Sequence, residues 1–118
     1  MAQSPVKLTM ARLKRLGYPA AIAERRLSHA GTHGRTVDLF GVFDIMAIAS
    51  GQIWGIQVCG RDFAAHDRKI RRSCEALAWL RAGGSVQLWG WRRRKHGRCV
   101  RWRERIKIYE PSDFDEEE

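Results

Sequence analysis

Two apolar segments of the chain each carry one polar side chain at a position where a buried strand should have none. Asp44 lies in residues 37–48 and Gln57 in residues 52–59, with Ser50-Gly51 as a tight turn between the segments. A buried carboxylate destabilises a protein strongly unless a cation or a hydrogen-bonding network compensates it. In a chain this basic, we expect a divalent metal ion beside a phosphate group to supply that compensation.

Size and composition limit the class of protein. With 118 residues, of which 44% are hydrophobic, the chain can bury one core, and we expect a single domain over residues 1–109. No segment approaches the roughly 20 apolar residues that span a bilayer, and the first residues do not resemble a secretory signal. The cysteines are odd in number and form no C-x-x-C pair, which favours a reducing compartment. We therefore expect an intracellular, cytoplasmic protein without a membrane partner.

The charge is distributed unevenly along the chain. Residues 110–118 hold six of the 13 acidic residues and no basic residue, so the remainder carries 22 basic and 7 acidic residues, a net charge of +15. Such an excess favours polyanionic partners, because each neutralised phosphate releases a counterion. We expect nucleic acid as the partner, and a disordered acidic tail over residues 110–118.

The spacing of apolar and capping residues predicts the elements that position Asp44 and Gln57. Ser4-Pro5 is typical of a helix start and Gly17 of a helix end, which predicts a helix between them. Residues 18–27 fit a helix or a strand, which leaves the place of Glu24 open. Residues 28–35 are rich in glycine and read as a loop.

The second half of the chain predicts one helix and two strands. Asp62 is expected to cap a helix that runs to residue 82, with Phe63, Ile70, Cys74 and Leu77 on its buried side. Strands are predicted over residues 86–91 and 98–108, joined by a hairpin loop over residues 92–97. The order of elements indicates an α/β or α+β domain in which helices flank a mixed central sheet.

These residues carry a resemblance to a known family. The runs DLFGVFDIMAI, IWGIQVCG and QLWGWRRR resemble the PD-(D/E)XK nuclease superfamily, and within it the small Holliday-junction resolvase-like and phage-encoded nucleases. The likeness spans residues 17–102 and implies a restriction-endonuclease-like fold. It also implies an Mg²⁺- or Mn²⁺-dependent endonuclease that hydrolyses DNA, including branched DNA, as a homodimer and without a small-molecule cofactor.

The resemblance also implies roles for individual residues. Asp44 matches the metal-binding aspartate, Gln57 the second acidic position and Cys59 the lysine position two residues later, while Glu24 matches a further glutamate. Because Cys59 cannot replace an ammonium group, Lys69 or Arg61 would have to supply the positive charge. The expected catalytic residues are thus Asp44, Gln57, Glu24 and Lys69, and the expected metal ligands are Asp44, Gln57, Asp38 and the carbonyl group of Val58.

Ordinary structural roles remain open for the same residues. Asp44 also fits an edge-strand carboxylate that accepts backbone hydrogen bonds, and Gln57 also fits an amide paired across the sheet. Asp38 fits a turn cap or a partner of Arg35, and Lys69 fits a solvated helix position. Cys59 fits a small buried hydrophobic residue.

The basic residues form the second half of the hypothesis. Arginine donates paired hydrogen bonds to phosphate, and four like charges on one strand face repel one another without an anionic partner. The expected nucleic-acid-binding residues are Arg35, Arg61, Arg68, Arg71, Arg72, Arg92, Arg93, Arg94, Lys95, Arg98, Arg101 and Arg103. A non-catalytic DNA-binding protein of the same fold and an RNA-binding protein that uses the basic hairpin remain alternatives.

Overall fold

The first helix, α1 (Pro5–Leu16), begins and ends where the sequence predicts. The Ser4 hydroxyl accepts a hydrogen bond from the Lys7 backbone amide at 3.2 Å, and Gly17 ends the helix in the left-handed conformation with φ of 82°. Both features satisfy backbone groups that a helix end leaves unpaired. Leu13 is fully buried and fixes the helix against the sheet.

The computed structural model describes residues 4–27 and 35–115, which form a mixed α/β domain. The predicted loop over residues 28–35 therefore lies outside the described residues except for Arg35. After α1 the elements are β1 (Ala20–Ile22), β2 (Arg25–Leu27), β3 (Arg35–Val37), β4 (Ile45–Ala49), β5 (Gln52–Cys59), α2 (Phe63–Arg71), α3 (Cys74–Arg81), β6 (Ser85–His96), β7 (Cys99–Ile108) and the 3-10 helix η1 (Pro111–Asp113).

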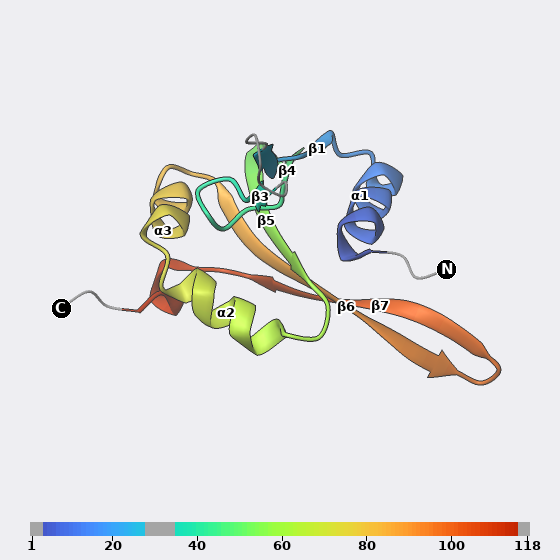
Figure 1. Cartoon of the computed structure of the whole chain (residues 1–118). Coiled ribbons are helices and arrows are strands. Elements are labelled where there is room, and N and C mark those ends of the chain that lie inside the picture. The colour runs from blue at the N-terminus through green and yellow to red at the C-terminus, as the bar shows by residue number, and fades with distance from the viewer. Residues whose placement is uncertain (1–3, 28–34, 116–118) are drawn as a thin grey trace.

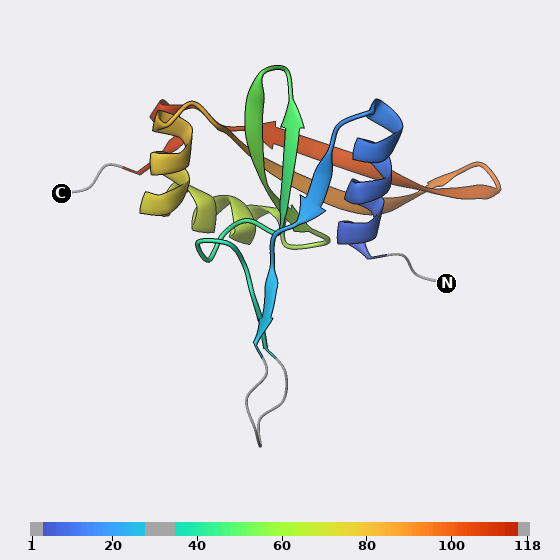
Figure 2. The same ribbon diagram turned by 90° about the horizontal axis from the view of Figure 1, so that it is seen from above.

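The central sheet has five strands in the order β1-β4-β5-β6-β7. Only β5 and β6 are parallel; the other neighbouring strands run antiparallel. The separate β2–β3 hairpin projects away from this sheet (Figure 2). A mixed sheet flanked by helices agrees with the prediction, and residues 18–27 turn out to hold two short strands.

Helices cover both faces of the sheet (Figure 1). α1 packs on one face, over a cluster that includes Ile45, Ile56 and Trp89. α2 and α3 pack on the other face, over a cluster that includes Phe43, Ile70 and Leu88. The near-continuous apolar character of β5 follows from this double coverage.

The β4–β5 hairpin is present, but its first strand is shorter than predicted. Ser50 and Gly51 form the turn with φ of 54° and 75°. The predicted strand over residues 37–48 is wrong for residues 38–44, because Gly41 adopts φ of 72° and the chain turns there. That turn buries Phe43 in the core, with its ring centroid 4.7 Å from that of Trp79.

The single helix predicted over residues 62–82 is two helices. α2 ends at Arg71, and the Ser73 hydroxyl caps α3 by accepting a hydrogen bond from the Ala76 backbone amide at 3.0 Å. This new start rotates the helical face, so Ala76 is fully buried while Cys74 is exposed. The prediction of a buried Cys74 is therefore wrong.

The predicted loop over residues 92–97 is mostly strand. β6 and β7 remain paired out to His96 and Cys99, and the turn is confined to Gly97-Arg98. They form a long two-stranded ribbon that extends past the helices (Figures 1 and 2). Four basic residues predicted on a loop therefore stand on a strand with alternating faces.

The acidic tail is ordered over residues 110–115. These residues include η1, and Phe114 packs against Tyr109 with 6.0 Å between ring centroids. The Asp115 backbone amide donates to the Arg71 carbonyl oxygen at 2.9 Å. The prediction of disorder from residue 110 is therefore wrong for these residues, while residues 116–118 lie outside the described part. Within the described residues, no helix is long and apolar enough to cross a membrane.

Candidate metal centre and basic groove

The backbone of Asp44 is held by β5 and by the residue that follows β1. Its amide donates to the Ile56 carbonyl oxygen at 2.8 Å, and its carbonyl oxygen accepts from the Ala23 amide at 2.8 Å. Because Ile45 pairs with Ile56, Asp44 and Gln57 are the next positions in register and share the sheet face opposite α1. Asp44 is thus fixed at the start of β4, with only 7% of its surface exposed.

The side chains of Asp44 and Gln57 meet. The Asp44 Oδ2 atom accepts hydrogen bonds from Gln57 Nε2 and from the Val58 backbone amide, both at 2.8 Å. Val58 therefore contacts Asp44 through its N–H group, whereas its carbonyl group was the expected ligand. The Gln57 Oε1 atom is buried and has no hydrogen-bond partner among the described residues. An acceptor that is buried and unpaired is unusual in a folded protein.

Two further carboxylates lie at the base of the β2–β3 hairpin. Arg25 pairs with Val37, so Glu24 and Asp38 are the next positions outward in the same register. Carboxylate oxygens of Glu24, Asp38 and Asp44 all lie within 4.8 Å of one another. We call these three residues together with Gln57 the acidic cluster. It collects oxygen donors from four places in the chain.

The electrostatics of the acidic cluster disfavour full ionisation without a cation. Burial, and then a hydrogen bond with Asp38, raise the pKa of Asp44 to about 7, while the hydrogen bonds from Val58 and Gln57 lower it. Like charges held this close raise the free energy of the ionised form. Several carboxylate oxygens and one amide oxygen are the ligand set that Mg²⁺ and Mn²⁺ prefer, so the donor set fits such an ion.

A lysine from α2 lies beside the acidic cluster. Lys69 Nζ is 3.7 Å from Asp38 Oδ2, and its side chain is 46% exposed. Burial, and then the nearby Asp62 and Asp44 carboxylates, raise the pKa of Cys59 to about 11, so its thiol stays neutral at pH 7. The positive charge next to the cluster therefore comes from the helix and not from β5.

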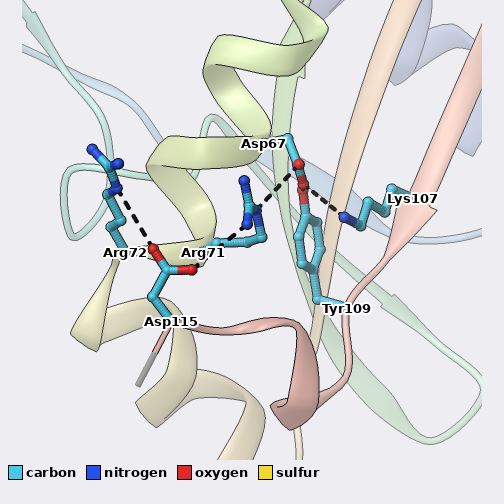
Figure 3. Close-up of polar contacts among 6 residues, drawn as sticks. All are labelled: Asp67, Arg71, Arg72, Lys107, Tyr109 and Asp115. Atoms are coloured by element: carbon cyan, nitrogen blue, oxygen red, sulfur yellow. Dashed lines mark hydrogen bonds and ion pairs between the residues drawn. The ribbon is translucent and has the colours of Figure 1, made fainter. Parts of the chain in front are cut away.

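The helix that carries Lys69 is fastened by a second polar network (Figure 3). Asp67 accepts hydrogen bonds from Lys107 Nζ at 2.8 Å and from the Tyr109 hydroxyl at 2.6 Å, and it pairs with Arg71 at 3.3 Å. Asp115 pairs with Arg71 and with Arg72, at 3.6 Å in each case. Two arginines expected to bind nucleic acid are thus engaged by the C-terminal segment.

The remaining basic residues divide between a groove and open surface. A groove of about 730 Å³ runs between the start of α2 and the β6–β7 ribbon, and its basic lining residues are Arg61, Arg92, Arg94, Lys95, Arg101, Arg103 and Arg105. We call it the basic groove. Arg93 lies instead on the other face of the ribbon, 5.8 Å from the Trp102 ring centroid. Arg68 is exposed on α2, Arg98 is exposed in the turn, and the side chain of Arg35 lies outside the described part.

Sequence reasoning missed two residues near these sites. His66 stands one helical turn before Lys69, and its Nδ1 atom is buried without a partner in the described part of the chain. Burial, and then the charge of Lys69, lower the pKa of His66. The carboxylates of Asp62 and Asp38 act in the opposite direction but are outweighed. Arg105 lies over the Phe63 ring at 4.0 Å and lines the basic groove. His66 could have been found from its spacing of three residues before Lys69 on one helix. Arg105 could have been found because it alternates with Arg101 and Arg103 along one strand.

Comparison with known proteins adds no family. Neither the protein-family models nor the curated proteins with which we compared the chain gave a match.

Proposed function

We propose that the protein is a metal-dependent endonuclease that hydrolyses DNA phosphodiester bonds, with the restriction-endonuclease-like fold of the PD-(D/E)XK superfamily that its sequence resembles. One observation carries this proposal: three carboxylates, one of which accepts a hydrogen bond from the buried amide of Gln57, gather on the same sheet face as a groove lined by arginines. An oxygen-rich cation site near a phosphate-binding surface is the minimum that metal-assisted phosphodiester hydrolysis requires.

The residues of the acidic cluster have distinct tasks in this proposal. Glu24, Asp38, Asp44 and the Oε1 atom of Gln57 would hold one Mg²⁺ or Mn²⁺ ion. When bound, such an ion neutralises charge on the phosphate and acidifies a water molecule. The Val58 amide orients Asp44, as its 2.8 Å hydrogen bond indicates. Lys69 supplies the positive charge that Cys59, at the family's lysine position, cannot supply.

DNA is the proposed substrate because of the charge outside the acidic tail. A net charge of +15 before residue 110 attracts a polyanion and accelerates its association. A cut through both strands needs two active sites, so we propose a homodimer as the active unit. Branched DNA remains the proposed substrate geometry, on the strength of the sequence resemblance.

The proposal is tested by DNA cleavage with a matched pair of variants. Wild-type protein with Mg²⁺ or Mn²⁺ is expected to cut labelled duplex or four-way DNA, and EDTA is expected to stop the reaction. Asp44→Asn should reduce the rate by about a hundredfold or more while DNA binding persists. As the matched control, Glu75→Gln removes the same charge from an exposed position on α3, and this variant should cut at the wild-type rate.

Two results would contradict the enzyme assignment. If the wild type binds DNA but cuts no substrate with either ion, the protein is a non-catalytic DNA-binding protein. If it binds structured RNA more tightly than DNA at matched salt, the basic residues serve RNA.

A further inference from the structure

Helix α2 separates the acidic cluster from the basic groove. On one flank of α2, Lys69 pairs with Asp38 of the acidic cluster. On the other flank, Asp67 pairs with Lys107 of β7, and the Phe63 ring lies under Arg105. No residue of the acidic cluster lines the basic groove. Among the described residues, the two sites therefore have no lining residue in common.

The basic groove carries far more positive charge than its surroundings neutralise. Its lining holds six arginines and one lysine, and Glu104 is its one acidic member in the described part of the chain. Glu104 already pairs with Arg12 at 3.1 Å. Within the described residues, none of the lining arginines has a carboxylate partner within 4.0 Å.

The two strands of the ribbon place like charges directly opposite each other on the groove side. Arg92 pairs in register with Arg103, and Arg94 pairs with Arg101. Directly opposed like charges destabilise an antiparallel pair of strands. On the other face of the ribbon, Arg93 does not face a like charge. It stands opposite Trp102 and contacts the Trp102 ring. The repulsion is thus confined to the face that lines the groove.

An anion between the strands removes this repulsion. Arginine guanidinium groups bind phosphate through paired hydrogen bonds, and successive phosphates of DNA recur along a backbone, as the arginines do along the ribbon. Arg105 is held in place by the Phe63 ring, which reduces the entropy that it loses on binding.

We propose that the basic groove is a second DNA-contact site, which holds backbone phosphates of duplex DNA away from the bond that is cut. This inference rests on the proposed function, since it assigns the acidic cluster to the cut itself. The groove then anchors the DNA, and the acidic cluster acts on a separate phosphate across α2.

The first test measures binding without a metal ion, so it does not depend on cleavage. The probe is a duplex of about 20 base pairs, which at about 3.4 Å per pair exceeds the 50 Å long axis of the molecule. Arg94→Gln and Arg101→Gln should each weaken binding several-fold and reduce the slope of log affinity against log salt by about 1. Arg15→Gln removes an equal charge from an exposed position on α1 and should leave the slope unchanged.

The second test separates anchoring from chemistry. At saturating DNA, Arg94→Gln and Arg101→Gln should lose far less of the cleavage rate than Asp44→Asn does, whereas at low DNA concentration their rate should fall with the affinity. Their melting temperatures at low salt should equal or exceed that of the wild type, because a repulsion has been removed. A structural role for the arginines would lower those temperatures instead.

Three outcomes overturn the inference. An unchanged salt slope in both arginine variants means that the groove does not bind DNA. A loss of the saturating rate as large as that of Asp44→Asn means that the groove holds the phosphate being cut. A lower melting temperature means that the arginines stabilise the ribbon. Absence of cleavage by the wild type contradicts only the proposed function, since the salt slopes are measured without it.

Discussion

At the scale of single residues, Asp44 is held in place by its strand contacts and is also the proposed metal ligand. Its Oδ2 atom accepts hydrogen bonds from Gln57 and from the Val58 amide, and a further hydrogen bond links Asp44 to Asp38. The two interpretations of this residue, a satisfied strand carboxylate and a metal ligand, are therefore compatible. The strand contacts hold the carboxylate in one orientation, which is what a rigid metal site requires.

Gln57→Glu tests the role of the amide at this position. The change replaces the donor to Asp44 with a fourth carboxylate, so it should destabilise the metal-free protein by about 2 kcal/mol or more. The added ligand should strengthen Mg²⁺ binding about tenfold, because a carboxylate binds a hard cation better than an amide does. Thermal melting with and without Mg²⁺ measures both effects. A variant that melts like the wild type under both conditions would place Gln57 outside the site.

At the scale of elements, α2 is positioned by its contacts with β7 and the C-terminal segment. Burial alone would raise the pKa of Asp67, but the hydrogen bonds and charges of Lys107, Tyr109 and Arg71 outweigh burial and lower it. Burial and the bond to Asp67 raise the pKa of Tyr109, so its hydroxyl group remains a donor. The network holds the helix that brings Lys69 to the acidic cluster.

This network predicts how stability depends on pH. A carboxyl group with a lowered folded-state pKa stabilises the fold above its unfolded-state pKa, and the benefit is lost as pH falls through the folded value. For Asp67 the loss should begin near the ordinary value of 3.8. Asp67→Asn should remove about 1–2 kcal/mol of stability at pH 7 and flatten the decline below pH 4. Urea unfolding at several pH values measures this, and an unchanged decline would refute the assignment.

The sequence predicts helices and strands best where one residue type caps a helix end or adopts the backbone conformation of a turn. Ser4 and Gly17 mark α1 because they satisfy its unpaired end groups, and Ser50-Gly51 marks a hairpin because of its turn geometry. The apolar run before Ile45 predicts a strand but forms a buried turn, because a buried turn and a buried strand can have the same composition. Ser73 caps α3 inside an otherwise continuous helical pattern, so that pattern does not reveal the break between the two helices.

The candidate site was predictable only in part for the same physical reason. Alternation of side chains along paired strands implies that Asp44 and Gln57 share a face. The positions of Glu24 and Asp38 depend on the register of β2 with β3, and no local pattern in residues 18–37 specifies that register. The pairing of Lys69 with Asp38 depends on how α2 crosses the sheet, which only the packed core determines.

At the scale of the whole molecule, the distribution of acidic residues is the informative feature. Only seven acidic residues precede residue 110, against 22 basic residues. If the acidic residues were dispersed among so many basic residues, each carboxylate could pair with its own lysine or arginine. Three of them instead gather within 4.8 Å of one another. That arrangement is unfavourable for the fold alone and favourable for a protein that binds a divalent cation.

The central claim is that these carboxylates bind a divalent cation, and calorimetric titration with Mn²⁺ tests it most directly. The account predicts one ion bound per chain in the wild type, an affinity at least about tenfold lower in Asp44→Asn, and wild-type binding in Glu75→Gln. Absence of Mn²⁺ binding by the wild type, or equal binding by Asp44→Asn, would contradict the account.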